Sequence, residues 1–400
     1  MNALLFVGIL LFLARLKARR QIRFLLNGPE TAGKMRSLFG VGSIPHGDTL
    51  DYAFSRLDAE KVQEIVTGIP EVLIRKKVLD PYRLLDKFHT VALDGTGVLV
   101  FRSRHCPQCL SKKLHNGETL FYHPVLEAKL VTPNGFAFSL MTEFIENIDP
   151  GAAKQDCELK AFYRMAPRLK ARFPRLPLCL LGDGLFAAGA VFSICEKNHW
   201  AYVITLQDKD LSSIHEEFHA LAPLQPENKL IFHTGPQSLI RQAYQWVTDI
   251  DYMDASRVPH KVNVLQCREN QATRLQTFKW ITNLTLTPSR VPHVANQGGR
   301  LRWKIENEGF NDQKNGGYEL EHAYSTNPVA MKIFYFLLQI AHALAQLMEK
   351  GSLLKAVFPK GLGSRKNVGM RLRDEWVYLP ITLDLDAWAN ASFQIRFDTS

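Results

Sequence analysis

The spacing of apolar residues divides the chain into a helical part and a part in which strands alternate with helices. Up to about residue 75 the pattern is helical, with helices expected at 49–57 and, capped by Asp58, at 59–66. From Phe88 onward, short apolar runs bounded by turn residues predict strands. These runs are 89–94, 98–101, 121–131, 136–145, 176–181 and 200–206, and helices are expected at 156–173 and 185–197.

With the adjacent runs 89–94 and 98–101 counted as one, three strands, a helix, a strand, a helix and a strand predict an α/β fold built around a mixed sheet. The first and fourth strands can lie side by side, because the hairpin strands between them extend the other edge. Asp94 ends an apolar run of the first strand, and Asp183 follows the fourth. We therefore expect these two carboxylates to lie close together although they are far apart in the sequence.

The second half of the chain changes pattern three times. Residues 207–290 contain short β-like pieces at 230–233, 242–250, 260–267 and 278–286, which predict a mostly β insertion. Residues 300–314 follow with a helical pattern, in which Leu301, Ile305 and Phe310 form the apolar face and Arg302 lies one turn before Glu306. Residues 329–348 predict a packed apolar helix, and residues 352–373 are basic.

Composition and charge indicate a globular protein with a polyanionic partner. Apolar residues make up 46% and charged residues 22% of the chain, as in ordinary globular proteins. The net charge of +10 makes nucleic acid the first candidate partner. The six Cys residues are scattered, which favours a reducing compartment and a cytoplasmic location. Residues 1–14 are apolar but short for a membrane span, so a buried helix is expected there in preference to an anchor.

Asp94, Asp183 and Glu306 are the candidate metal ligands. Hard cations such as Mg²⁺ prefer oxygen ligands, and a few carboxylates with a substrate phosphate make a sufficient site. Two ions about 3.5–4 Å apart activate an attacking oxygen and stabilise the departing one. The alternatives stay open on spacing alone: an Asp at a strand end is often a structural cap, and residues 300–314 can be a surface helix with one Arg302–Glu306 ion pair.

The sequences VALDGTG, LLGDGLF and RLRWKIENEGF resemble the three acidic motifs of DDE transposases, and the match is closest to insertion-sequence transposases of the group-four type. The third motif of that group is Tyr-x2-Arg-x3-Glu-x6-Lys, often with Trp after the Arg and Ile before the Glu. Arg302, Trp303, Ile305 and Glu306 match it position by position. Position 299 is Gly where the motif has Tyr, and Lys314 comes one residue late, about 80° from the Glu306 face of an α-helix.

The resemblance implies an RNase H-like fold, a mixed five-stranded sheet flanked by helices with a β insertion before the last catalytic helix. It implies phosphoryl transfer on double-stranded DNA, in which water attacks at a transposon end and the freed 3′-hydroxyl attacks target DNA. Asp94, Asp183 and Glu306 would hold Mg²⁺, which Mn²⁺ can replace. The DNA-binding residues would be Arg302 at a phosphate, Lys314, and Trp246 or Trp280 stacked on a flipped base. A homodimer in the synaptic complex and association with the nucleoid are also expected.

A second candidate metal site follows the first strand. Cys106, Cys109, His115 and His123 have the spacing Cys-x2-Cys-x5-His-x7-His, and thiolate and imidazole ligands can bind a structural Zn²⁺. The second half of this spacing lies outside the usual zinc-finger pattern. Two free thiols in a loop between strands are the alternative.

These observations predict three regions. Residues 1–84 form a helical N-terminal region that binds DNA, residues 85–345 the catalytic domain with its insertion at about 207–290, and residues 346–400 a basic C-terminal tail. The basic stretches can instead be solvated faces. Two rival functions remain, a transposase-derived protein that binds DNA without cutting it, and an RNase H-like nuclease without strand transfer.

Overall fold

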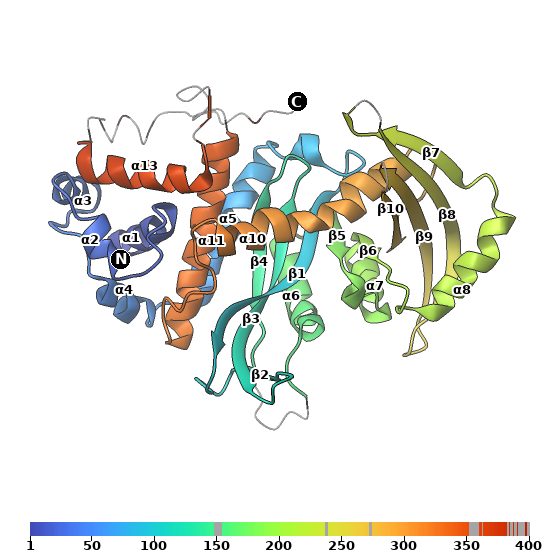
Figure 1. Cartoon of the computed structure of the whole chain (residues 1–400), viewed down its shortest axis with the longest axis horizontal. Coiled ribbons are helices and arrows are strands. Elements are labelled where there is room, and N and C mark those ends of the chain that lie inside the picture. Colours follow the sequence, from blue (N-terminus) through green and yellow to red (C-terminus); the bar gives the residue numbers. More distant parts are fainter. Residues whose placement is uncertain are drawn as a thin grey trace.

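A single mixed sheet of ten strands runs through the protein (Figure 1). The computed structural model describes residues 1–147, 154–236, 239–271, 274–351, 360, 361 and 363–381, and the single positions 384, 387, 390 and 397. The strand order is β2-β3-β1-β5-β6-β10-β9-β8-β7, and β4 also pairs with β3. An α/β fold around a mixed sheet is therefore confirmed.

Five of the first six strands follow the sequence prediction closely. The six are β1 His89–Phe101, β2 Leu110–Lys113, β3 Thr119–Val131, β4 Ala137–Phe144, β5 Leu178–Gly182 and β6 Ala201–Thr205. The two predicted runs at 89–94 and 98–101 belong to one strand, which carries an irregularity between Gly97 and Leu99. β1 is antiparallel to β3 and parallel to β5, and β5 is parallel to β6. The short β2, which pairs with β3, was not predicted.

The predicted insertion is β-rich, but it continues the central sheet. Its elements are α8 Ser212–Leu221, β7 Lys229–Thr234, β8 Ile240–Met253, β9 Pro259–Gln271 and β10 Arg274–Thr282. β10 pairs with β6, with Trp280 opposite Thr205. A five-stranded sheet was therefore wrong in extent, because β6 would otherwise present an open edge and the insertion supplies the strand that covers it.

Helices cover both faces of the sheet. α6 Glu158–Arg172 and α7 Gly189–Asn198 share one apolar core with β1, β3, β4 and β5. A helical segment from residue 291 to 315, drawn in orange, crosses the sheet in Figure 1. Its apolar residues pack against β5, β6 and the insertion strands in a second core. This segment carries Glu306 and is described with the site.

The N-terminal region packs on the long helix α11 Pro328–Lys350. Its helices are α1 Asn2–Leu13, α2 Gln21–Leu25, α3 Thr31–Phe39, α4 Gly47–Phe54 and α5 Ala59–Arg75. Asp58 caps α5 as predicted, accepting from the Glu60 N–H at 3.0 Å, but the helix runs nine residues past its predicted end at 66 to Arg75. Val7, Leu11 and Phe12 of α1 are at most 1% exposed, so the apolar start is a buried helix.

Within the described residues, one helix is long and apolar enough to cross a membrane. This is α11, and 78% of its most apolar window is buried inside the protein, as in the core helix of a globular domain. The packed helix predicted at 329–348 is confirmed.

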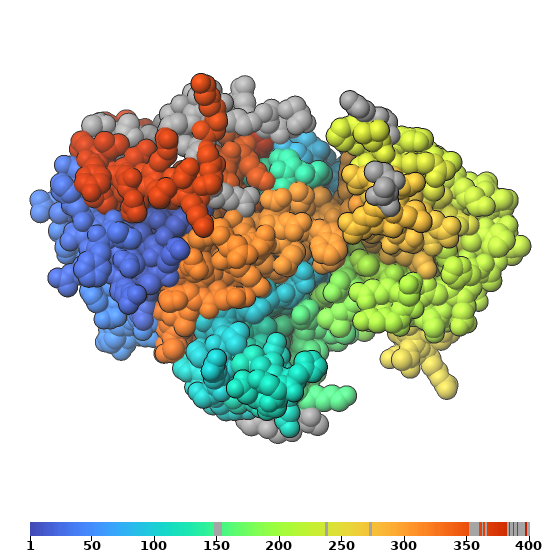
Figure 2. All heavy atoms as spheres, viewed as in Figure 1, coloured from blue at the N-terminus to red at the C-terminus, as the bar shows by residue number. Residues whose placement is uncertain are grey.

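The C-terminal boundary predicted at residue 346 falls inside α11. Residues 352–359, including the predicted basic residue Lys355, lie outside the described part. Farther on, α13 Arg365–Tyr378 is a helix that docks on the N-terminal helices, and Figure 2 shows the two forming one continuous surface at an end of the molecule. The Lys34 ammonium of α3 donates to the carbonyl oxygens of Glu375 at 2.5 Å and Trp376 at 2.6 Å.

Candidate active site

Asp94 and Asp183 lie on neighbouring parallel strands at the same level of the sheet. Ala92 of β1 is opposite Leu181 of β5, and each aspartate comes two residues later. Residues two apart on a strand point to the same face, and neighbouring strands lie about 4.8 Å apart. The predicted proximity of these two carboxylates follows directly from this register.

Glu306 reaches the aspartates on a helical segment that is not a regular α-helix. The segment consists of α9 Val291–His293, the π-helix η5 Val294–Gly298, the 3₁₀-helix η6 Gly299–Arg302, the π-helix η7 Ile305–Phe310 and α10 Asn311–Asn315. The predicted apolar face is confirmed, since Leu301, Ile305 and Phe310 are at most 5% exposed. The changes of helix type mean that residues around Glu306 do not follow the 100° step of an α-helix, and such π-turns are frequent at functional sites.

Arg302 joins this segment to the first aspartate. Its Nη1 lies 3.3 Å from Oδ2 of Asp94, and the Arg302 side chain is 12% exposed. The surface-helix alternative expected Arg302 to pair with Glu306. In the structure the guanidinium is directed into the site, which places one cation among several carboxylates.

The pKa of Asp94 responds to burial and to the charges of the neighbouring groups. Burial raises the pKa of Asp94 from 3.8 to about 6, and the charges of Asp183 and Glu306 act in the same direction. The Arg302 guanidinium and the Gly95 N–H, which donates to Asp94 Oδ1 at 3.0 Å, lower it. The three predicted carboxylates lie on β1, at the end of β5 and on η7, and the charges of Asp183 and Glu306 act on Asp94.

Glu158 is a fourth carboxylate at this site that the sequence analysis missed. It is the first residue of α6 and lies against Gly95, where any side chain would collide with its carboxylate. Burial raises the pKa of Glu158 to about 7, with further contributions from Asp94 and Asp183. The helix was predicted, but its position over β1 was not. The glycine directly after Asp94 was the only local sign that another group approaches.

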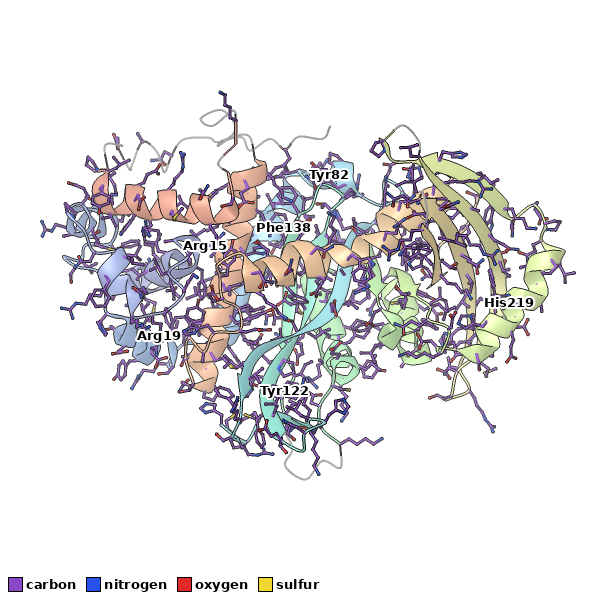
Figure 3. The ribbon with its side chains drawn as sticks, in the orientation of Figure 1. Arg15, Arg19, Tyr82, Tyr122, Phe138 and His219 are labelled. Carbon is purple, nitrogen blue, oxygen red and sulfur yellow. The ribbon has the colours of Figure 1, made fainter. Side chains whose placement is uncertain are left out.

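A cavity of about 690 Å³ extends from Asp183 over the insertion. Arg302 and Trp303 line it from the helical segment, and Lys279 and Trp280 from β10. His219 of α8, labelled in Figure 3, lies at its insertion side. Because the wall contains both cations and aromatic rings, the cavity can take an anionic ligand with flat rings.

The tryptophans of this cavity differ in exposure. Trp303 is 54% exposed, and the guanidinium carbon of Arg302 lies 4.7 Å from its ring centroid. Trp280 is 2% exposed and packs directly on Gly299, where a side chain would collide with the indole. This contact explains why glycine stands at the position where the motif has tyrosine. Trp246 is 1% exposed and belongs to the core, so its ring is not available for the predicted stacking on a base in this structure.

Lys314 is not directed to the carboxylates. Its Nζ lies 3.1 Å from Oε1 of Glu321, at the end of the helical segment. Glu308, the other acid of the motif region, pairs with Lys304 at 3.1 Å. A side chain at Gly135 would lie within ordinary contact of the Glu308 carboxyl, so Glu308 faces the turn that follows β3. Glu306 is thus distinguished from Glu308 by position.

Buried hydrogen bonds fix the end of the segment that carries Glu306. Gln313 Nε2 donates to Gln339 Oε1 of α11 at 2.8 Å, and Lys129 Nζ of β3 donates to the same oxygen at 2.6 Å. Lys129 also pairs with Glu127 at 3.3 Å, and neither side chain of this pair is exposed. The segment is therefore held to α11, and through Gln339 of α11 it is linked to β3.

A second group of ligands lies near the β2–β3 hairpin. Atoms of Cys106, Cys109 and His123 lie within 4.8 Å of one another and can hold a metal ion. Tyr122, labelled in Figure 3, precedes His123 on β3 and marks this end of the sheet. His115, predicted as a ligand, is exposed in the turn between β2 and β3. Leu110 pairs with Tyr122, next to His123, and Lys113 pairs with Thr119 farther along the hairpin. These two pairs are about 10 Å apart, and His115 lies beyond Lys113, so it is too far from His123 to share a metal ion with it.

Neither a comparison with models of protein families nor a comparison with curated proteins returns a match for this chain.

Proposed function

We propose that the protein is a DDE transposase with an RNase H-like core, as its three acidic motifs suggest. It would hydrolyse the phosphodiester bond at transposon ends and transfer the freed 3′-hydroxyl into target DNA. One observation carries this proposal. Asp94, Asp183 and Glu306 come from three separate elements, and the negative charges of the latter two act on Asp94. The Arg302 guanidinium lies 3.3 Å from the Asp94 carboxylate.

The strand order supports an RNase H-like core. Five strands run in the order β4-β3-β1-β5-β6, with β3 antiparallel and β5 parallel to β1. This order is consistent with the mixed five-stranded unit that the motifs imply, with the first aspartate on its central strand and the second at the end of the neighbouring strand. The β insertion stands between the second aspartate and Glu306, as in transposases of the group-four type.

The carboxylates suit Mg²⁺ or Mn²⁺. All three offer oxygen atoms, and Asp94 holds its proton up to about pH 6 because it is buried among like charges that a cation would offset. A divalent ion bound by Asp94, Asp183 and Glu306 supplies an activated oxygen nucleophile and charge stabilisation at the leaving oxygen. Glu158 adds a fourth carboxyl group beside Asp94, and its pKa of about 7 lets it hold or release a proton near neutral pH.

The remaining residues of the site act on DNA. Arg302 lies at the boundary between the carboxylates and the cavity, where its guanidinium can contact a phosphate next to the reacting bond. Trp303, the exposed ring of the cavity, replaces Trp246 as the residue that stacks on an unpaired base. Lys314 would have to leave Glu321 to contact DNA.

The partners follow from the reaction. A net charge of +10 suits a double-stranded DNA substrate. Two transposon ends are joined in one reaction, so a homodimer in the synaptic complex, located in the cytoplasm and associated with the nucleoid, is part of the proposal.

The test is cleavage of a labelled duplex that carries the sequences flanking the reading frame, with Mg²⁺ or Mn²⁺. The wild type is compared with Glu306→Gln and with Glu308→Gln, a matched change two residues away whose carboxylate pairs with Lys304. The proposal expects the wild type and Glu308→Gln to cut and Glu306→Gln to bind without cutting. Products in which a cut end is joined to target DNA would distinguish a transposase from a nuclease, which only cuts.

Two results count against this assignment. Equal cutting by the wild type and Glu306→Gln would remove Glu306 as the third acid. Binding without cutting by the wild type would favour a transposase-derived DNA-binding protein.

A further inference from the structure

The ligand atoms of Cys106, Cys109 and His123 already have nearly the spacing of a zinc site. The two Sγ atoms are 3.5 Å apart, and Nε2 of His123 lies 3.3 Å from Cys106 Sγ and 3.1 Å from Cys109 Sγ. Tetrahedral zinc, with bonds of about 2.3 Å to sulfur and about 2.0–2.1 Å to nitrogen, separates two sulfurs by about 3.8 Å and sulfur from nitrogen by about 3.6 Å. Small outward shifts of the three atoms therefore make room for the ion.

The backbone holds the two cysteines in this arrangement. The Cys109 N–H donates to the Cys106 carbonyl at 3.3 Å, which closes a tight turn. Asn147, just after β4, clamps that turn from outside. Its backbone N–H donates to the Gln108 carbonyl and its Nδ2 to the Cys109 carbonyl, each at 3.1 Å. The ligands are thus positioned by a segment that is distant in sequence.

Hydrogen bonding alone gives a poor account of His123. The residue is 2% exposed, and its Nδ1 is buried with no hydrogen-bond partner among the described residues. Its Nε2 faces two sulfur atoms at once. A single N–H can point at only one of them, whereas a cation between the three atoms satisfies all of them together.

We propose that this cluster is a structural Zn²⁺ site, and that His105, which lies outside the group of atoms within 4.8 Å of one another, moves toward the ion as its fourth ligand. Nε2 of His105 lies 2.5 Å from the Thr326 carbonyl oxygen. Because a carbonyl only accepts, the proton is on Nε2 and Nδ1 keeps its lone pair for a metal. The His105 ring stacks on Phe101 at 4.8 Å, and the His123 ring meets the same Phe101 edge-on at 6.4 Å.

The chemistry of the ligands selects the metal. Thiolate and imidazole suit Zn²⁺, whereas the carboxylates near Asp94 suit Mg²⁺, so the two sites take different ions from the same solution. Binding releases the thiol protons of Cys106 and Cys109 to solvent. The closed site would tie the loop after β1 to β3 and, through His105, to the segment that precedes α11.

The experiment measures metal in the full-length protein. Protein produced with zinc in the medium is desalted and its zinc content measured by mass spectrometry, and apo protein is titrated with Co²⁺. We expect one zinc per chain, and with Co²⁺ a sulfur-to-metal charge-transfer band together with the intense visible bands of a tetrahedral ion. The Co²⁺ titration uses the unaltered chain, so it does not depend on whether a variant folds.

Two matched pairs of variants assign the ligands. Cys106→Ser should lose the metal while Cys157→Ser, at an exposed cysteine outside the cluster, keeps it. His105→Gln should weaken binding at least about tenfold while His115→Gln leaves it unchanged. Far-ultraviolet circular dichroism shows whether each variant is folded.

Three results would overturn the proposal: wild-type protein with neither zinc nor a cobalt–thiolate band, a Cys106–Cys109 disulfide in protein kept under reducing conditions, or full zinc content in Cys106→Ser. Loss of metal in Cys106→Ser with no change in His105→Gln would retain the site and refute His105 as its fourth ligand.

Discussion

The carboxylate site predicts that Mg²⁺ binding strengthens steeply between pH 6 and pH 8. At pH 6 without metal, Asp94, with a pKa of about 6, is half protonated, and Glu158, with a pKa of about 7, is about nine-tenths protonated. A divalent ion requires Asp94 to be ionised and drives the proton from its neighbour Glu158. The two groups therefore release about 1.4 protons per ion bound at pH 6 and about 0.1 at pH 8.

The same pKa values give the size of the effect. Protonation of Asp94 weakens binding about twofold between pH 8 and pH 6, and protonation of Glu158 about tenfold. Together they make about a 20-fold change in the dissociation constant, or about 1.8 kcal/mol. Removing the Glu158 carboxyl as Glu158→Gln should leave only the twofold part. Glu308→Gln should keep the full change, because Glu308 pairs with Lys304 away from the site.

Isothermal titration calorimetry measures both quantities. Mg²⁺ or Mn²⁺ is titrated into the full-length protein at each pH, in two buffers with different ionisation enthalpies, and the difference in heat gives the number of protons released. A dissociation constant that does not change with pH, or binding without proton release at pH 6, would refute the assignment of Asp94 and Glu158 to the metal site.

Metal affinity rises with pH, but the stability of the metal-free protein falls with pH. Both pKa values are raised above their ordinary values of 3.8 and 4.5, so between roughly pH 4 and pH 7 the folded protein binds more protons than the unfolded chain. The free energy of unfolding then falls as the pH rises, by up to about 3 kcal/mol for Asp94. Metal-free protein should melt at a lower temperature at pH 8 than at pH 5, Mg²⁺ should restore the loss, and Glu158→Gln should reduce it.

Three further changes test other parts of the site. Trp303→Ala should weaken binding of a duplex with unpaired bases at its end by about 1–3 kcal/mol in a fluorescence titration, while Trp303→Phe keeps most of the affinity. A fully paired duplex should bind equally well to the wild type and to both variants. Gly299→Tyr restores the motif, but its side chain would displace Trp280, so it should destabilise the fold by about 1–3 kcal/mol in urea unfolding. An unchanged unfolding midpoint would contradict the contact between residue 299 and Trp280. Lys129→Met should cost about 3–5 kcal/mol by leaving the buried Glu127 carboxylate without its cation, with only hydroxyl donors such as Ser139 and Tyr335. Adding Glu127→Gln should recover part of the loss, which chemical denaturation of the single and double variants measures.

The sequence predicted the parts of the site that depend on local pattern and chain order. Asp94 and Asp183 stand at the ends of apolar runs. The hairpin strands that follow the Asp94 strand occupy one of its edges, so the strand that precedes Asp183 can pair only with its other edge. The burial of Leu301, Ile305 and Phe310 follows from helical spacing. None of these conclusions needs a contact between side chains.

What the sequence could not predict depends on packing between distant elements. Glu158 lies in a predicted helix, but its approach to Gly95 follows from how α6 crosses the sheet. Residues along the insertion strands alternate between two faces of the sheet, but this pattern does not show which face the helical segment covers. In the structure Trp246 is buried and Trp303 is exposed. Pairing of β10 with β6 likewise depends on which edge is free.

The position of Glu306 depends on residues far from the reaction. The helical segment that carries it contains two π-turns, which are weaker than α-helical turns, so its course is set by what it packs on. Gln313 fixes its end to Gln339 of α11, and α11 in turn forms a common core with the N-terminal helices. Removing α1 would expose the apolar face of α11 and release this support. The N-terminal region therefore contributes to the geometry of the carboxylates even if it touches no DNA.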